Sequence, residues 1–300
     1  MRDYQNNKIL ILGGTRFFGK SIFEMFKANG FVIFTASNKK SVGYDSHYLI
    51  DRNNPEDLNR LAENCFDVVI DMLCYNPLSA KKVCDAFRGK CRKFVFISSG
   101  DVYSLNFELN KQYNEHEFYL DYDVSYLNDS KWNDIEFNKR NYVLGKYLAE
   151  QVFETDPFFS PISLILRLSN VVSLECDPTL RFKRLYDAAK NGDIIGPIDV
   201  QSSFIHYNEV KYILFEMIKQ EVTSGIYNIS TLDNTLIFEL YTFIQKAIYP
   251  QKEFIKVDSH LPSENLIISP RSCSLDSSKL YRTIDYNPLF YKNLLTEIAE

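Results

Sequence analysis

The first 170 residues alternate between short, continuously apolar runs and longer segments with the spacing of amphipathic helices. Apolar runs of this length, rich in β-branched and aromatic residues, are typical of strands buried on both faces. We expect such strands at 8–12, 31–35, 48–50, 67–71, 93–98 and 162–167, with helices at 17–29, 55–64, 78–87 and 135–154. Strands that alternate with helices form a parallel sheet covered on both faces. The sequence therefore predicts a doubly wound α/β fold, whose ligands bind at the carboxyl ends of the strands.

Two parts of the chain depart from this alternation. Residues 104–140 are acidic, polar and rich in tyrosine, without a clear period. We interpret them as a long insertion that serves as a lid or as an oligomer contact. Beyond residue 170 the pattern loosens, with helical spacing at 180–191, 208–219 and 235–248 and short strands at 204–205 and 226–229.

The composition limits the kinds of protein that this chain can be. With 300 residues, 45% of them hydrophobic, it can bury a large core in one large domain or two closely packed ones. Its formal net charge is −5, whereas non-specific nucleic-acid binding needs a basic surface, so we expect no nucleic-acid partner. No apolar run approaches the roughly 20 residues that span a bilayer, so we expect no membrane segment.

The cysteines and histidines give no sign of a disulfide framework or a metal site. The six cysteines include no C-x-x-C pair, and the four histidines are not spaced like zinc ligands, so we expect free thiols and no metal. The N-terminus is polar until Ile9, unlike a secretory leader. These features predict a cytoplasmic protein.

The most informative segment is "ILILGGTRFFGK" (9–20), an apolar run followed by a glycine-rich turn and a helical pattern. Gly13 and Gly19 occupy the outer positions of G-x-x-G-x-x-G, where glycine permits a tight turn and close helix–strand packing beside a phosphate. Arg16 stands at the middle position. An ordinary β–α turn is the alternative, but the place between first strand and first helix favours a nucleotide cofactor. The predicted contacts are Gly13, Gly14, Thr15, Arg16, Phe17, Phe18 and Gly19.

The end of the second strand bears on which dinucleotide binds. NAD sites place Asp or Glu there to bind the ribose 2′-hydroxyl, whereas this chain has "TASNKK" (35–40) and no carboxylate before Asp45. Ser37, Asn38 and Lys39, together with the Arg16 guanidinium, suit a 2′-phosphate. We therefore expect NADP(H) and keep NAD(H) as the alternative. Lys39 and its neighbour can also be read as an ordinary solvated turn.

A candidate catalytic pair lies on the helix predicted at 135–154. Tyr142 and Lys146 are four residues apart, which places them on one helix face. A tyrosine with a pKa near about 10 is a poor acid–base catalyst at neutral pH, and a nearby ammonium favours its phenolate. The Y-x-x-x-K pattern occurs four times in this chain, so it proves nothing alone. The pair at Tyr142 is distinguished by its context, because it follows a strand that ends in Ser98 and Ser99. There the Ser99 hydroxyl can orient a carbonyl. A turn or cap role for Ser99 is the alternative.

Six segments, in order, resemble the extended short-chain dehydrogenase/reductases, the NAD(P)-dependent epimerase/dehydratase group that acts on nucleotide sugars. Their order along most of the chain is more specific than any one motif. The segments are "GGTRFFG" (13–19), "FVFISSGDVYS" (94–104), "YVLGKYLAE" (142–150), "ILRLSNVVSLECDPTLRF" (165–182), "SSFIHYNEV" (202–210) and "GIYNIS" (225–230). Departures are Arg16, "DMLCYNP" (71–77) in place of His-Leu-Ala-Ala, and the long gap before Tyr142.

The resemblance implies a Rossmann domain at 1–170 plus about 202–228, and a smaller, discontinuous nucleotide-sugar domain at 171–201 and 229–300. It implies that Tyr142 is the acid–base residue, with Lys146 as its partner and Ser99 as the orienting hydroxyl. The other implied contacts are Asp51, near the adenine, and Arg52 for the cofactor, and Asp101, Asn170 and Arg181 for the substrate. A homodimer or a monomer is expected.

The residues around Ser99 bear on which reaction is expected. 4,6-Dehydratases of the group carry adjacent carboxyls after this strand, and Gly100 removes one of them. The missing ribose carboxylate favours NADPH as a consumed reductant. The expected reaction is reduction of the 4-keto group of a nucleotide-linked deoxyhexose, such as dTDP-4-dehydro-6-deoxyglucose, for surface polysaccharide synthesis. An NAD-dependent 4-epimerase is the first alternative, and a non-catalytic NADP sensor or an RNA-binding member of the group is the second.

Overall fold

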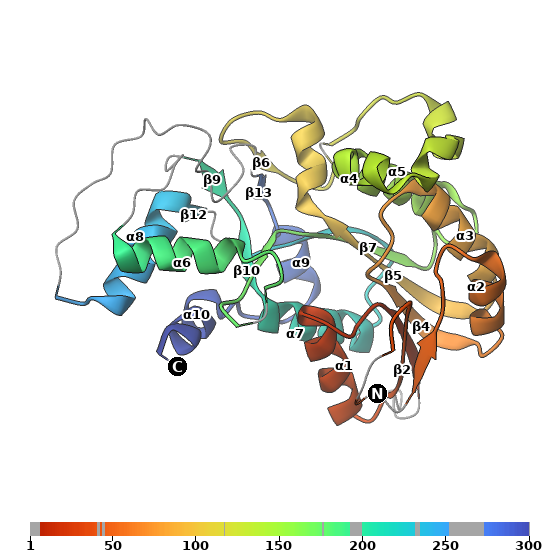
Figure 1. Cartoon of the computed structure of the whole chain (residues 1–300), viewed down its shortest axis with the longest axis horizontal. Helices are drawn as coiled ribbons and strands as arrows, with labels where there is room; N and C mark the ends of the chain where they lie inside the picture. The colour runs from red at the N-terminus through yellow and green to blue at the C-terminus, as the bar shows by residue number, and fades with distance from the viewer. Residues whose placement is uncertain are drawn as a thin grey trace.

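The computed structural model describes residues 7–40, 43, 46–116, 118–175, 177–192, 200–231, 235–251 and 273–299. Figure 1 shows the chain with a large sheet at one end and a smaller group of helices at the other. The described cysteines Cys65, Cys74, Cys84, Cys91 and Cys273 are free thiols. Within these ranges, every helix is too short or too polar to cross a membrane.

Seven strands form the main sheet, and all neighbouring strands run parallel. They are β1 (Lys8–Leu12), β2 (Val32–Ser37), β3 (His47–Leu49), β4 (Phe66–Asp71), β5 (Cys91–Ser99), β7 (Ser163–Leu168) and β11 (Gly225–Ile229). The order across the sheet is β11-β7-β5-β4-β1-β2-β3, so the direction of winding reverses between β1 and β4. The doubly wound α/β fold is therefore confirmed, and its reversal point is where ligands of such sheets bind.

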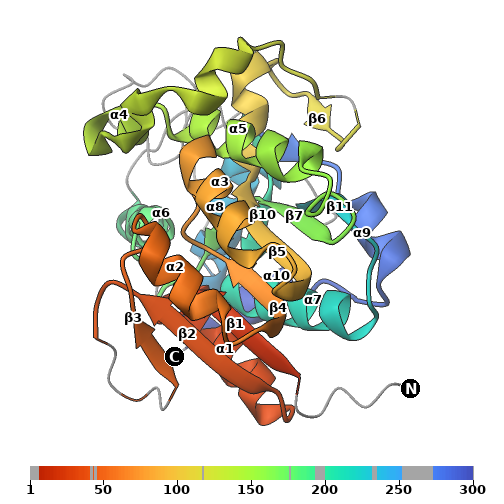
Figure 2. The same ribbon diagram turned by 90° about the vertical axis from the view of Figure 1, so that its right-hand side faces the viewer.

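Helices cover both faces of the sheet (Figure 2). On one face lie α1 (Phe18–Ala28), α7 (Tyr207–Lys219) and α9 (Ser278–Thr283), and on the other lie α2 (Pro55–Ala62), α3 (Pro77–Phe87) and α5 (Tyr142–Thr155). Successive strand residues point to opposite faces, so Ile9 and Ile11 join the first core, whereas Leu10 and Leu12 join the second. This double burial explains why the strands read as continuous apolar runs.

The insertion is more ordered than its sequence indicates. It contains 3₁₀ turns at Gly100–Asn106, Val124–Asn128 and Ser130–Asn133, and the strand β6 (Gln112–Tyr113). Its aromatic residues Tyr113, Phe118 and Trp132 join a separate buried cluster, together with Tyr103 and with Tyr147 of α5. The tyrosine-rich composition without a helical or strand period is thus explained by packing of irregular backbone.

The single helix predicted at 135–154 is wrong, because the chain forms α4 (Ile135–Arg140) and then α5. Asn141 separates them with a backbone φ of −111° and ψ of 27°. Its side-chain Nδ2 and its backbone N both donate to the carbonyl oxygen of Phe137, at 2.9 and 3.0 Å. Asparagine competes in this way with regular helical bonding, and here Asn141 separates the end of α4 at Arg140 from the start of α5 at Tyr142.

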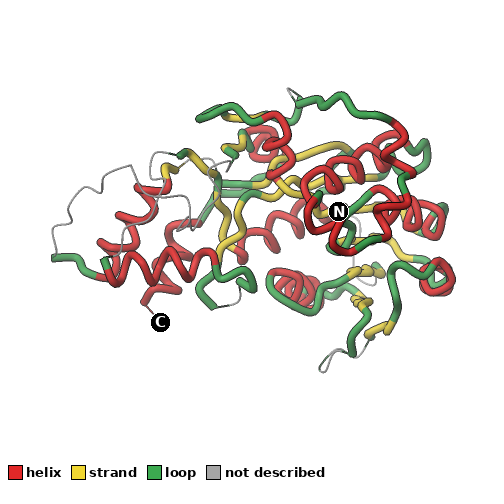
Figure 3. The backbone as a smooth tube through the Cα atoms, turned by 45° about the horizontal axis from the view of Figure 1, so that its top comes forward, coloured by secondary structure: helices red, strands yellow, loops and turns green. Residues whose placement is uncertain are grey.

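The C-terminal elements pack into a third core, at one end of the molecule in Figure 3. It is built around α6 (Arg181–Asn191), α8 (Ile237–Ile248) and α10 (Phe290–Ala299). Among the described residues, three small two-stranded sheets lie in this half and at its junctions. They are formed by β8 (Asn170–Val172) with β10 (Phe204–His206), β9 (Gln201–Ser202) with β12 (Thr235–Leu236), and β6 with β13 (Ser274–Leu275). The helices at 278–283 and 290–299 were not expected from the sequence. The domain boundaries remain a prediction.

Candidate active site

A cavity of about 830 Å³ lies at the carboxyl ends of β1, β2, β5 and β7. It brings together most of the residues that the sequence singled out. The predicted residues along its wall are Gly13, Gly14, Thr15, Arg16, Phe17, Phe18, Ser37, Asn38, Lys39, Ser99, Asp101, Tyr142, Lys146 and Asn170. Gly19 lies outside this wall, behind the turn.

The glycine turn lets the backbone form the floor of this cavity. Gly13 and Gly14 have φ values of 102° and 75°, which side-chain-bearing residues rarely adopt. A Cβ on Gly19 would lie 2.8 Å from the Gly14 Cα, so only glycine allows α1 to start this close to the turn. No side chain caps α1, and its first turn holds no acidic residue. An uncapped helix N-terminus beside a cavity is a suitable place for a phosphate.

Phe17 precedes α1 in an unusual conformation, with φ of 50° and ψ of −140°. Such backbone geometry in a non-glycine residue costs free energy and persists where packing enforces it. The Phe17 ring stacks on Tyr207, the first residue of α7, at 6.4 Å between centroids. Contact with α7 therefore holds the turn in shape at the cavity.

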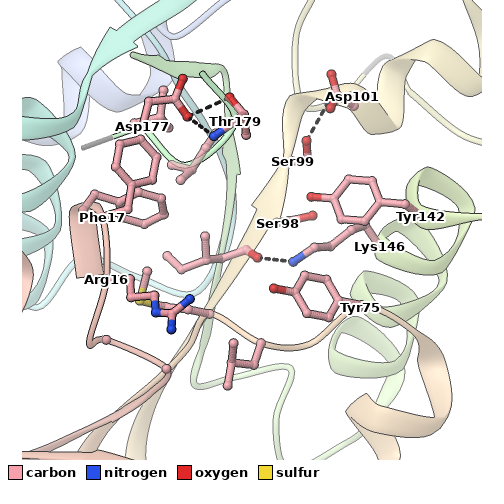
Figure 4. A pocket seen from close by; sticks show the side chains of 18 of the residues that line it. Arg16, Phe17, Tyr75, Ser98, Ser99, Asp101, Tyr142, Lys146, Asp177 and Thr179 are labelled. Carbon is pink, nitrogen blue, oxygen red and sulfur yellow. Dashed lines mark hydrogen bonds between the residues drawn. The ribbon is translucent and has the colours of Figure 1, made fainter. Parts of the chain in front are cut away.

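The end of β2 supplies polar and positive groups to the same cavity. Ser37, Asn38, Lys39 and Lys40 line it, and positions 37–40 hold no carboxylate. The Ser37 Oγ donates to the Lys39 carbonyl oxygen at 3.0 Å, which forms a tight turn. The Arg16 side chain also extends into the cavity (Figure 4).

Lys146 is buried at the base of the cavity, with 3% of its surface exposed. Its Nζ donates to the Ile97 carbonyl oxygen at 2.8 Å and lies 6.0 Å from the centroid of the Tyr142 ring. Burial lowers the pKa of Lys146 to about 8. At neutral pH the ammonium form still predominates, close enough to stabilise a phenolate of Tyr142.

Two serines end β5, and the structure distinguishes their roles. The Ser98 Oγ donates to Oε1 of Glu150 at 2.5 Å, and Glu150 is itself in a buried ion pair with Arg167. The Ser98 hydroxyl proton is therefore engaged in a structural hydrogen bond. The Ser99 Oγ accepts from the Asp101 backbone N at 3.2 Å, and its own proton has no acceptor among the described residues, so a ligand can accept it. Figure 4 shows the Tyr142 hydroxyl directed toward these serines.

A second cavity of about 610 Å³ lies beyond the end of β3 and contains the other two predicted cofactor residues, Asp51 and Arg52. The Arg52 Nη2 forms a buried ion pair with Oδ2 of Asp71, the last residue of β4. Burial lowers the pKa of Arg52 and Asp71 raises it, with a net increase. Arg52 is 8% exposed, and its Nε and Nη1 have no hydrogen-bond partner among the residues that the structure describes. Both nitrogens are shielded from solvent, so Arg52 lines the second cavity without presenting these two donors at its surface.

Two of the three predicted substrate residues line the first cavity, and the side chain of the third is not described. Asp101 and Asn170 line the first cavity, and the Asn170 Nδ2 donates to the Ser202 Oγ at 2.9 Å. The backbone of Arg181 begins α6, but its side chain lies outside the described residues.

Sequence reasoning missed several residues along the cavity, including Tyr75, Asp177 and Thr179. Asp177 is 6% exposed, and its Oδ1 accepts from the backbone N and the hydroxyl of Thr179. Asn76 and Pro77 form a recognisable helix start, which could have placed Tyr75 at the end of the strand–helix loop.

Comparison with known proteins gives matches to structures alone: no model of a protein family matches this sequence, and no curated protein matches it. UDP-glucose 4-epimerase from Thermotoga maritima, solved with UDP-glucose, aligns with a TM-score of 0.70 and 15% identity over 97% of this chain and 98% of that chain. UDP-glucuronic acid 4-epimerase from Bacillus cereus, in complex with UDP-glucuronic acid and NAD, aligns with a TM-score of 0.69 and 16% identity over 97% of this chain and 99% of that chain. dTDP-glucose 4,6-dehydratase from Bacillus anthracis, in complex with NAD, aligns with a TM-score of 0.70 and 14% identity over 97% of this chain and 95% of that chain.

At these identities the match concerns the fold, and it extends over nearly the whole of each chain. The sequence motifs resemble the same group of enzymes. The motif resemblance rests on short segments of sequence, whereas the structural match rests on the backbone of the whole chain. The chain therefore has the fold of the NAD-dependent nucleotide-sugar epimerases and dehydratases.

Proposed function

We propose that this chain is a member of the extended short-chain dehydrogenase/reductases that uses NADPH to reduce the 4-keto group of a nucleotide-linked deoxyhexose. One observation carries the proposal: Ser99, Tyr142 and Lys146 line the same cavity as the glycine turn. A hydroxyl, a phenol and an ammonium in a cavity whose glycine turn suits a phosphate are the groups that carbonyl reduction needs.

The residues present fit a dinucleotide. The positive φ of Gly13 and Gly14 exposes backbone at the start of an uncapped helix, which suits the pyrophosphate. Asp51 and Arg52 line the second cavity, and the Asp51 carboxylate can accept hydrogen bonds there, which supports a place for the adenosine half. Lys146 would hold the ribose next to the nicotinamide, with Tyr142 beside it.

The bound cofactor would supply a hydride to the carbonyl carbon. Tyr142 would give its proton to the carbonyl oxygen, so that the ketone becomes an alcohol. Lys146 would stabilise the phenolate that Tyr142 becomes, and Ser99 would donate a hydrogen bond that orients the carbonyl oxygen. Ser99 suits this role better than Ser98, because the Ser98 proton is held by Glu150.

NADPH rather than NADH is favoured by the charges around the expected 2′-phosphate. Arg16, Lys39 and Lys40 line the cavity, and a carboxylate at positions 37–40 is lacking. A guanidinium or ammonium attracts the phosphate, whereas NAD sites use a carboxylate for the 2′-hydroxyl.

The substrate would bind between the sheet and the C-terminal helices, with 171–201 and 229–300 as the nucleotide-sugar domain. Asn170 and Asp101 line the cavity, which supports contacts with the sugar. Arg181 remains a proposed contact with a substrate phosphate. A dTDP-linked 4-keto sugar of surface polysaccharide synthesis is the proposed substrate class.

A 4-epimerase is the second candidate, because two of the structures named above are 4-epimerases. An epimerase would retain NAD and cause no net oxidation or reduction. Dehydration is disfavoured, since Gly100 stands where a second carboxyl would be needed.

The test is to add NADPH and a panel of nucleotide-linked 4-keto sugars to the purified chain. The reductase proposal predicts loss of NADPH absorbance in equal amount to the alcohol formed. Interconversion of 4-hydroxyl epimers without added NADPH would identify the epimerase instead. NADPH binding with no turnover on any sugar would identify a non-catalytic sensor.

A further inference from the structure

A second phenol, that of Tyr75, lies beside the proposed catalytic pair. Tyr75 belongs to the loop between β4 and α3, and its ring centroid is 6.1 Å from that of Tyr142. The Lys146 Nζ lies 4.9 Å from the Tyr75 ring centroid, nearer than the 6.0 Å to the Tyr142 ring. The same Nζ is also 4.9 Å from the ring centroid of Phe96. Tyr75 therefore forms part of the immediate surroundings of the ammonium.

The backbone of Tyr75 is held in place although its side chain is 43% exposed. A Cβ on Gly145 would lie 2.3 Å from the Tyr75 carbonyl oxygen, so α5 packs directly on this loop. The next residue, Asn76, accepts from the Ser79 backbone N at 2.8 Å and donates through Nδ2 to Oδ1 of Asn138 at 2.8 Å. The loop is thus fixed between α3, α5 and the insertion, which gives Tyr75 a defined position.

Tyr75 lines both cavities, so it lies where the glycine-turn side of the site meets the side that contains Arg52. A dinucleotide that extends from one cavity into the other passes this residue. Figure 4 shows the Tyr75 hydroxyl directed into the cavity, on the side of Lys146 away from Ser99. The phenol makes no hydrogen bond within the described part of the chain. Partial burial and the carboxylate of Asp71 raise the pKa of Tyr75, so the phenol is a neutral donor at physiological pH.

We propose that Tyr75 is a cofactor-binding residue with two tasks, and this inference rests on the proposed function. Its hydroxyl donates a hydrogen bond to a phosphate or ribose oxygen in the middle of the dinucleotide. Its ring covers Lys146 and keeps water from the ammonium. Tyr142 remains the proton donor, because its hydroxyl faces Ser99 and that of Tyr75 does not.

Two substitutions separate these tasks. Tyr75→Phe keeps the ring and removes the hydroxyl, whereas Tyr75→Leu removes both. Hydrogen bonds to charged groups contribute enough that Tyr75→Phe should weaken NADPH binding about tenfold. Its kcat at saturating NADPH should stay near that of the wild type. Tyr75→Leu should in addition move the alkaline limb of the kcat/KM profile to higher pH, because water would reach Lys146. Tyr119→Phe, at a residue that is 72% exposed on the insertion, is the matched control.

Binding is measured by fluorescence titration with NADPH and with NADH, and folding by circular dichroism. Wild-type affinity in Tyr75→Phe would overturn the hydrogen bond, and an unmoved pH profile in folded Tyr75→Leu would overturn the covering role. Loss of turnover in Tyr75→Phe with unchanged binding would make Tyr75 the proton donor, which also overturns the inference. If the wild type binds neither NADPH nor NADH, the proposed function itself fails. If the wild type binds NADPH and the Tyr75 variants bind it equally well, only the inference about Tyr75 fails.

Discussion

The Nζ atom of Lys146 donates a hydrogen bond to the carbonyl oxygen of Ile97, one residue before the two serines that end β5. Ile97 is paired with Leu166 of β7, so this bond ties the ammonium to the interior of the sheet. The chemistry expected of Lys146 therefore depends on a strand residue that contributes only its backbone. A lysine ammonium has further donors, which remain for a phenol or a ribose.

Tyr142→Phe should retain NADPH binding and lose turnover by about 100-fold or more, because the variant lacks the proton that general acid catalysis requires. Steady-state kinetics with a 4-keto sugar nucleotide and a fluorescence titration measure the two effects. Tyr186→Phe is the matched control, since Tyr186 belongs to another Y-x-x-x-K pattern, on α6. Near-normal turnover in Tyr142→Phe would refute its assignment.

Turnover should fall as pH rises through about 8, the pKa to which burial lowers Lys146. The sign follows from the direction of titration: below this pKa the lysine is charged and stabilises the phenolate, and above it the charge is lost. Initial rates over a pH series at saturating NADPH measure the effect, with NADPH affinity followed at each pH. A rate that stays constant well above pH 8 would contradict this role of Lys146.

Arg16→Ala should weaken NADPH binding more than NADH binding, by about tenfold, because only NADPH carries the 2′-phosphate that the guanidinium can bind. Titrations with both dinucleotides give the ratio. Lys20→Ala removes a nearby charge on α1 whose side chain is 63% exposed, and it should leave the ratio unchanged. Equal losses for the two cofactors would show that Arg16 does not read the 2′-phosphate.

Asp71→Asn should lower the free energy of unfolding by about 3–5 kcal/mol, because it leaves the buried Arg52 without its counter-charge. Arginine stays charged in proteins, so it cannot escape this cost by losing a proton. The double variant Arg52→Met with Asp71→Leu should recover much of the loss. Urea denaturation measures the free energy of unfolding of the single and the double variant. Arg60→Met, which breaks an exposed pair with Asp57, serves as the control and should have little effect. A single Asp71 variant as stable as the wild type would contradict this account.

The parallel sheet could be predicted because its strands are buried on both faces and therefore appear as continuous apolar runs. The glycine turn and the pair of Tyr142 and Lys146 could be predicted because local backbone geometry and helical spacing bring these groups together. Both signals lie within short stretches of sequence.

The rest depends on contacts between distant segments. Tyr75 follows a strand in an irregular loop, and its position beside Lys146 results from the packing of α5 through Gly145. The break between α4 and α5 results from the side-chain bonding of one asparagine, which helical spacing does not reveal. Part of the wall of the second cavity is formed by Trp132 of the insertion, a segment without periodic pattern.

The strand β11 completes the main sheet only after the chain has contributed β8, α6 and β10 elsewhere. During synthesis from the N-terminus, the outer edge of β7 thus stays open until residue 229 has left the ribosome. That edge belongs to a strand whose residues are all buried in the finished protein, and an open apolar edge pairs readily with other chains. A gene fragment that stops at residue 170 would encode six of the seven strands, and its product should aggregate rather than fold as a free nucleotide-binding unit.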